Sequence, residues 1–269
     1  PSVTSFGNGR GCLSERDVKL VIGKCSTSGR AEFGTSTRRP CKRRRMAKPN
    51  SHNQAQPDML IGVAGALPAR PVDIKPADAA RLVDMGFQAT SVTLGGPGDS
   101  SKNHLRNARA ILTDAGLVVA QANGSYGSLV APSKAERDRS VHELIDHMHS
   151  ARELGALTCY VRPGGLNHYG PWNPDQDHHL ESTFNRTLES LDEATRAAED
   201  LGVTLAFEGH VLSTIDRPER VTTILDAIDS PALTFNLDPV NFIGSIWDAW
   251  QPNGVFDRLI DGAGTRIRT

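Results

Sequence analysis

Two short stretches decide how this chain folds: Val203-Thr-Leu-Ala-Phe-Glu208 and Leu233-Thr-Phe-Asn-Leu-Asp238. Each is an apolar run that is too short and too rich in β-branched and aromatic residues for a helix, so each is predicted to be a buried strand that ends at a carboxylate. Between them, residues 218–228 repeat apolar side chains at helical spacing behind a proline that suits a first helical turn. This βαβ unit should deliver Glu208 and Asp238 to the same edge of a parallel sheet.

Four further apolar runs alternate with helical patterns in the same way. They predict strands at residues 59–64, 89–94, 117–122 and 157–162. The helices before the last three of these runs and before the run at 203–208 end in a glycine, which suits the left-handed residue that closes a helix. Strict alternation of this kind indicates a parallel sheet covered by helices. The junction glycines are Gly86, Gly116, Gly155 and Gly202.

A barrel is favoured over an open doubly wound sheet. The glycines near the first strand lack dinucleotide-binding spacing, and the cluster at 95–98 lacks the Lys-Ser/Thr of a phosphate-binding loop. Polar residues instead follow strand after strand, and in a (β/α)8 TIM barrel those ends converge on one pocket. They are Gln121, Asn123, Arg162, Glu208, His210, Asp238 and Asn241.

The charge distribution divides the chain into two parts. Residues 1–56 contain twelve Lys or Arg and three Asp or Glu, for a net charge of +9, whereas residues 57–269 carry eighteen against twenty-eight, for −10. The first part has few large apolar residues, so we expect a disordered basic tail followed by the barrel domain at 57–269. Its basic run at 38–45 is typical of a nuclear-import or nucleic-acid-binding tail, a targeting peptide, or a solvated segment without a selected role. A further alternative is that translation starts at Met46 or Met59, and that the residues before it are upstream sequence.

Cysteine spacing and hydropathy exclude some classes of protein. Cys12, Cys25 and Cys41 show no CxxC spacing, which argues against a structural zinc site, and Cys159 lies in a predicted strand and should pack in the core. No segment approaches the roughly twenty apolar residues needed to cross a bilayer. We expect a soluble, cytoplasmic protein without a membrane partner.

The strand ends resemble a known family. Leu205-Ala-Phe-Glu-Gly-His210, Asn236-Leu-Asp-Pro-Val-Asn-Phe242 and the long motif at 160–172 together resemble the xylose isomerase-like TIM-barrel superfamily, which includes sugar phosphate isomerases and epimerases. The resemblance spans residues 60–269. It implies a small sugar or sugar phosphate as substrate.

The resemblance also implies a divalent cation, Mn²⁺, Mg²⁺, Co²⁺ or Zn²⁺. In the family a Glu after strand five and an Asp after strand six are ligands, which by position correspond to Glu208 and Asp238. Such an ion polarises a sugar carbonyl and its neighbouring hydroxyl, which lowers the barrier to an enediolate. Proton removal beside the carbonyl needs a carboxylate base, and Glu208 is the candidate.

Several neighbouring residues are substrate-binding candidates, each with a plainer alternative. His210 binds substrate or is a partner of Glu208. Arg162 clamps a phosphate or carboxylate, or pairs with Glu208 or Asp238. Asn241 stands where many relatives have a histidine, and its amide can bind a hydroxyl. Asn167 and Trp172 lie in a loop that closes over the sugar or is ordinarily packed. We expect His142, His149, His178 and His179 to be solvent-exposed, without a role.

The last residues predict an incomplete barrel. Residues 265–269 read as the beginning of a seventh strand, and 213 residues from position 57 fall short of the roughly 250 of a full barrel. About six βα units are therefore expected. The histidine and glutamate ligands that relatives place after strands seven and eight are not expected, so activity is in doubt. Unpaired edges favour aggregation or a homo-oligomer.

Three functions remain open. The first is a metal-dependent sugar isomerase or epimerase. The second is a phosphodiesterase of the apurinic endonuclease type in the same superfamily. The acidic body argues against it, as do Gln121 and Asn123, which stand where histidine ligands would be needed. The third is a non-catalytic binding protein whose basic tail docks on nucleic acid or an acidic partner. Nucleic acid is the less favoured partner.

Overall fold

A single parallel sheet organises the molecule. The computed structural model describes residues 19–24, 59–95 and 101–269. Seven strands follow one another in chain order across the sheet, and every neighbouring pair is parallel. They are β1 (Lys19–Lys24), β2 (Met59–Ala64), β3 (Ala89–Gly95), β4 (Val118–Gly124), β5 (Thr158–Val161), β6 (Leu205–Phe207) and β7 (Leu233–Phe235).

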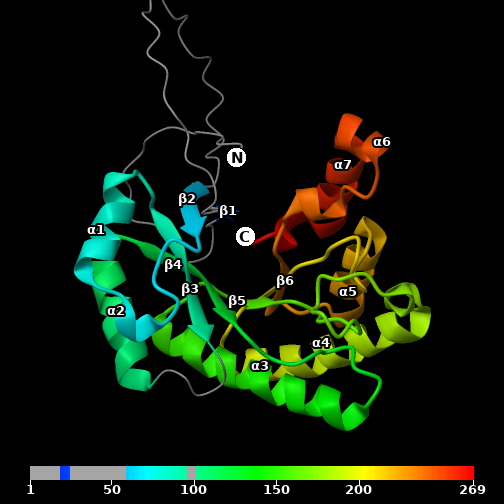
Figure 1. Cartoon of the computed structure of the whole chain (residues 1–269), viewed down its shortest axis with the longest axis horizontal. Helices are drawn as coiled ribbons and strands as arrows, with labels where there is room; N and C mark the ends of the chain where they lie inside the picture. Colours follow the sequence, from blue (N-terminus) through cyan, green and yellow to red (C-terminus); the bar gives the residue numbers. More distant parts are fainter. Residues whose placement is uncertain (1–18, 25–58, 96–100) are drawn as a thin grey trace, which may run out of the picture.

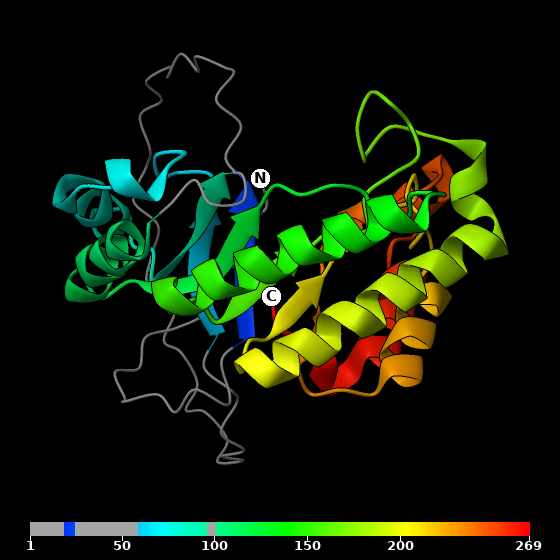
Figure 2. The same ribbon diagram turned by 90° about the horizontal axis from the view of Figure 1, so that it is seen from below.

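Helices cover the outside of this curled sheet, which forms a half-barrel of βα units (Figure 1). Figure 2 shows the two longest helices, α3 and α4, lying alongside each other across the sheet. The α-helices are α1 (Pro76–Asp84), α2 (Lys102–Asp114), α3 (Lys134–Leu154), α4 (Glu181–Leu201), α5 (Pro218–Ile228), α6 (Ile246–Trp250) and α7 (Asn253–Ala263). Short 3-10 turns are η1 (Pro71–Asp73), η2 (Gln176–His179), η3 (Pro239–Phe242) and η4 (Gly264–Arg266).

The six predicted strands and their junctions are confirmed. All four junction glycines have positive φ, and Gly155 and Gly202 are the left-handed residues that cap α3 and α4. The last two strands are shorter than the apolar runs that predict them. β6 ends at Phe207, so Glu208 follows it directly, whereas β7 ends at Phe235 because the chain then turns into η3.

Apolar helix faces pack against the sheet as their spacing predicts. In α4 the side chains of Phe184, Leu191, Ala194 and Ala198 are buried, and α3 buries the equivalent stripe. At the last two strands, the rings of Phe207 and Phe235 lie 5.4 Å apart between centroids, and both are fully buried. Cys159 is buried in the same core, as expected. This packing holds the strand ends that carry the candidate site.

One strand lies in a segment for which no element is predicted. β1 pairs with β2 along its whole length, from Lys19 beside Met59 to Lys24 beside Ala64. It adds a seventh strand to the six that the sequence predicts. The remainder of the expected tail lies outside the described residues, as do Cys12, Cys25, Cys41, the basic run at 38–45 and the loop at 96–98.

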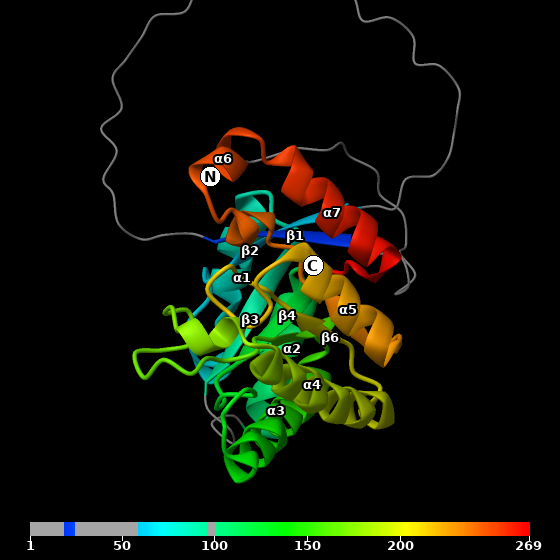
Figure 3. The same cartoon turned by 90° about the vertical axis from the view of Figure 1, so that its right-hand side faces the viewer.

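The opposite edge of the sheet is joined by the last residues of the chain. Ile267 forms a parallel bridge with Phe235, and the backbone N–H of Leu237 donates to the carbonyl of Thr269 at 2.6 Å. The predicted seventh strand therefore begins here, after the turn η4. The three views place the C-terminus beside β1, so the two edges of the curled sheet approach each other (Figure 3). In the described part of the chain, no helix is long and apolar enough to cross a membrane.

Candidate active site

Glu208 is the buried carboxylate at the centre of the candidate site. Its position directly after β6 places it at the carboxyl end of the sheet, and the residue is 2% exposed. Asn236 donates from Nδ2 to Oε2 of Glu208 at 3.0 Å, and Asn241 donates from Nδ2 to Oε1. Both carboxylate oxygens therefore accept a hydrogen bond from the chain that follows β7. A buried charge needs such partners, because leaving it unpaired is costly.

Tyr160 supplies a further donor from β5. Its hydroxyl hydrogen-bonds Glu208, and burial together with the negative charge of Glu208 raises the pKa of Tyr160 far above the ordinary value for a phenol. The phenol consequently keeps its proton and acts as a donor to the carboxylate. β5, β6 and β7 thus all contribute to one hydrogen-bonded cluster.

The cluster extends to β4 through Gln121. The side-chain Nε2 of Gln121 donates to Oδ1 of Asn236 at 3.4 Å, and Gln121 is itself buried. The convergence of strand ends that the sequence predicts is therefore observed for four neighbouring strands. Tyr160 and Asn236 are not among the predicted site residues. Asn236 lies within the run that predicts β7, two residues before Asp238, and Tyr160 lies two residues before Arg162, so their place at the strand ends was the available signal.

Asp238 lies in the turn between β7 and η3. Its backbone N–H donates to the carbonyl of Asn236 at 3.1 Å, and its own carbonyl accepts from the backbone N–H of Asn241 at 3.2 Å. These bonds fix Asp238 between the two amides that contact Glu208. Its half-buried carboxylate makes no hydrogen bond or ion pair with another described residue.

His210 and Trp172 meet at the edge of the site. Their ring centroids are 5.5 Å apart, so the long loop after β5 contacts the loop after β6. The Nδ1 of His210 accepts a hydrogen bond from the backbone N–H of Leu212 at 3.0 Å. A neutral ring with an accepting Nδ1 carries its proton on Nε2.

Asn167 binds within its own loop. Its Nδ2 donates to the carbonyl of Pro174 at 2.8 Å, and its Oδ1 accepts from the backbone N–H of Tyr169 at 2.9 Å. Both ends of the amide are thereby used to hold the loop that carries Trp172. This arrangement favours a positioning role for Asn167.

Arg162 contacts the chain after β4. Its guanidinium donates to the carbonyls of Gly124 at 3.3 Å and Tyr126 at 3.1 Å, and it lies 5.0 Å from the centre of the Tyr126 ring. The hydroxyl of Tyr126 in turn accepts from the backbone N–H of Arg162 at 2.7 Å. Arg162 thus ties two neighbouring strand ends together. Its Nε is buried without a hydrogen-bond partner among the described residues.

His178 corrects one prediction. It is expected to be solvent-exposed, but it is fully buried, because its ring bridges the two loops that border the site. Nδ1 donates to the carbonyl of Leu212, and Nε2 accepts from the backbone N–H of Leu166, both at 2.7 Å. Its neighbour His179 is exposed and pairs with Asp216. The exposure predicted for His142 and His149 is confirmed.

Comparison with known proteins identifies the family. The family model described as "Xylose isomerase-like TIM barrel" matches residues 79–264. The chain belongs to this family. The xylose isomerase-like match covers β3 to α7 and includes the whole Glu208 cluster.

Solved structures of xylose isomerase-like barrels share the fold at low identity. A 3-keto-D-glucoside 4-epimerase from E. coli is 16% identical over 75% of this chain and 77% of its own, with a TM-score of 0.58. A D-psicose 3-epimerase from Clostridium cellulolyticum H10, solved with D-tagatose, is 15% identical over 78% and 71%, with a TM-score of 0.60. A Mycobacterium smegmatis protein of this fold, solved with magnesium, is 15% identical over 71% and 66%, with a TM-score of 0.54.

The oxygen atoms at this xylose isomerase-like site are of the kind that bind a hard cation. Carboxylate and amide oxygens are what Mg²⁺ and Mn²⁺ prefer, and Glu208 and Asp238 supply two carboxylates next to Asn236 and Asn241. Within the described ranges, no group of three or more His, Cys, Asp or Glu side chains could hold a metal ion. The two carboxylates would therefore share an ion with ligands of another kind, such as amide oxygens or water.

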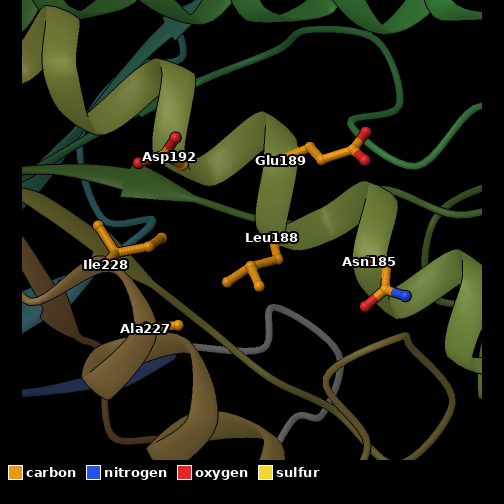
Figure 4. A pocket seen from close by; sticks show the side chains of 6 residues that line it. All are labelled: Asn185, Leu188, Glu189, Asp192, Ala227 and Ile228. Carbon is orange, nitrogen blue, oxygen red and sulfur yellow. The ribbon is translucent and has the colours of Figure 1, made fainter.

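A separate groove lies on the outside of the barrel. It has a volume of about 460 Å³ and lies between α4 and α5, where Figure 4 shows Leu188 and Ile228 facing each other. It includes none of the predicted site residues.

Proposed function

We propose that this chain is a sugar or sugar phosphate isomerase or epimerase that transfers a proton next to a carbonyl through an enediolate, with Glu208 as the base. The observation that carries the proposal is the buried Glu208 carboxylate, which accepts hydrogen bonds from Asn236 and Asn241, the two amides on either side of Asp238 in the chain after β7. Epimerases among the structural neighbours support the substrate class.

The donors around Glu208 keep it deprotonated and oriented. Hydrogen bonds from Asn236, Asn241 and Tyr160 favour the charged carboxylate, which is the form that abstracts a proton. They also restrict its rotation, so that one oxygen can be held toward the substrate carbon. We assign Asn241 to this positioning role, beside any contact that it makes with a substrate hydroxyl.

Other residues of the site bind and orient the sugar. Trp172 offers an apolar face, and the imidazole of His210, which packs against it, contacts the sugar at the same edge of the site. Arg162 supports the strand ends and leaves its Nε for an anionic group or water. Asn167 holds the loop in place.

A divalent ion, Mn²⁺, Mg²⁺, Co²⁺ or Zn²⁺, would be held by Glu208 and Asp238. When bound, it would polarise the sugar carbonyl and the adjacent hydroxyl. The structure solved with magnesium in the same family supports this choice of ion class.

Substitution of Glu208 by Gln tests the proposal. Calorimetric titration with Mn²⁺ should show at least about a hundredfold loss of affinity, since a ligand is worth more than its outer partners, which typically contribute 10- to 100-fold. Incubation with D-tagatose or D-fructose in D₂O should show no deuterium at the carbon beside the carbonyl. Glu193→Gln, an exposed position on α4, should behave as the parent does. Unchanged Mn²⁺ binding in Glu208→Gln would overturn the ligand assignment, and unchanged deuterium uptake would overturn the base.

A further inference from the structure

Two tryptophans are exposed on the short helix α6. Trp247 is 63% exposed and Trp250 is 76% exposed, and they are three positions apart, so both lie on one face of the helix. Large aromatic side chains of soluble proteins are mostly covered, and an exposed cluster marks a binding surface. Neither residue belongs to the Glu208 cluster.

The tryptophans line a cavity of about 540 Å³ together with polar side chains. The amides of Gln251 and Asn253 line it and make no side-chain hydrogen bond to another described residue. Asp248 and Arg258 add a carboxylate and a guanidinium. The cavity therefore combines two indole faces with unused planar donors and acceptors.

The cavity lies on the active-site side of the barrel. α6 follows η3, which comes after the carboxyl end of β7, and η3 carries Asn241, which contacts Glu208. In barrels of this type, the loops after the strands form the catalytic face. Ser245 fixes the start of α6, because its hydroxyl accepts from the backbone N–H of Asp248 at 3.1 Å and donates to the carboxylate of that residue at 2.7 Å.

We infer that this cavity is an accessory carbohydrate site that takes the pyranose rings of an oligosaccharide or glycoside. A pyranose presents a C–H face, which stacks on an indole, and hydroxyls around its rim, which planar amides and carboxylates bind in pairs. Gln251, Asn253 and Asp248 supply those groups beside the two tryptophans.

The polar lining favours a sugar over a second copy of this chain. The core of a protein interface is enriched in aromatic residues but depleted of charged ones. Here the carboxylate of Asp248, a group that interface cores avoid, lies in the same cavity as the tryptophans. Arg258 also lines the cavity and is held there by Glu219 at 2.7 Å. This inference rests on the proposed function, because that function supplies the substrate class. The accessory site would bind further sugar rings of a larger glycan.

Nuclear magnetic resonance of the indole N–H groups tests the inference on the full chain. The protein has three tryptophans, so each signal can be assigned by substitution. Titration with maltotriose and with cellotriose should shift the signals of Trp247 and Trp250 saturably with at least one of them. Trp250→Ala should weaken that binding at least about tenfold, as loss of a central aromatic contact does. Ile246→Ala is the matched control, since Ile246 is 73% exposed on α6 but does not line the cavity.

The outcomes separate this inference from the proposed function. Glu208→Gln should retain trisaccharide binding, and Trp250→Ala should retain deuterium exchange of a monosaccharide. Trp247→Ala provides a second variant if Trp250→Ala does not fold by circular dichroism. The inference is overturned if neither trisaccharide shifts the two signals. It is equally overturned if sedimentation velocity shows a dimer that Trp250→Ala dissociates and no sugar binds.

Discussion

Asn241 donates a hydrogen bond to the carboxylate of Glu208, although 33 residues separate them in the sequence. Because Asn236 donates to the other oxygen, the segment that follows β7 determines how the carboxylate after β6 is oriented. The orientation of the candidate base therefore depends on two adjoining strand ends.

Replacing Asn241 with Leu removes one of these donors at nearly constant volume. An oxygen of a buried carboxylate then lacks a partner, which costs about 1–3 kcal/mol of unfolding free energy. Urea denaturation measures this loss. Deuterium exchange into the sugar should fall as well, since Glu208 loses orientation. Asn107→Leu, an exposed position on α2, should change stability by no more than about 0.5 kcal/mol. Equal losses in the two variants would contradict the role of Asn241.

The position of Glu208 could be predicted from the sequence, but its partners could not. Apolar runs bounded by a carboxylate identify strands and their ends, because strand period and turn residues are local properties. The contacts of Tyr160 and Asn236 depend on which strands adjoin and on side-chain direction, which are tertiary properties. β1 escaped prediction because its apolar run, Leu20-Val-Ile, is only three residues long, and its partner β2 lies far along the sequence.

His178 illustrates the same limit for loops. The sequence shows two adjacent histidines in a polar stretch, which indicates exposure, whereas the structure buries the first between Leu166 and Leu212. Only the approach of two loops from different strands produces that environment.

Gly209 is predicted to tolerate no side chain. A Cβ at this position would lie 2.6 Å from the carbonyl oxygen of Ile215 and 2.5 Å from the ring of Phe242, so the backbone between Glu208 and His210 would have to move. We expect Gly209→Ala to lose about 1–3 kcal/mol of stability, as overpacking does, and most of its proton exchange. Urea denaturation and deuterium uptake measure the two effects. In Gly254→Ala, where nothing lies within 4 Å, stability should not fall.

Substitution of His178 by Ala should open the border of the site. It leaves the half-buried N–H of Leu166 and carbonyl of Leu212 without their partner, which costs up to about 1–3 kcal/mol for each group that water does not reach. Thermal and urea unfolding measure the loss. The matched control is His149→Ala on the exposed face of α3, for which a change within about 0.5 kcal/mol is expected. A similar response of both variants would contradict a bridging role.

Alkaline pH should destabilise the fold through three buried acids. Burial raises the pKa of Cys159 from 9.0 to about 12, and it also raises the pKa of Tyr126 and of Tyr160 above 10.0. A raised folded pKa means that stability is complete below the unfolded value and falls above it, because only the unfolded chain releases the proton. Above pH 9 the thiol should therefore remove about 1.4 kcal/mol of unfolding free energy per pH unit.

The tyrosines should make this loss steeper above pH 10, to about 4 kcal/mol per unit for the three groups together. Urea denaturation from pH 7 to about pH 10.5 measures the slope, within the range set by ordinary cysteine and tyrosine titration. Tyr160→Phe should make the slope above pH 10 shallower by about 1.4 kcal/mol per unit, because it removes one titrating group that Glu208 and burial hold protonated. An identical slope in the parent and in Tyr160→Phe would show that this phenol ionises as readily in the folded protein as in the unfolded chain, and the donor role assigned to Tyr160 would then be wrong.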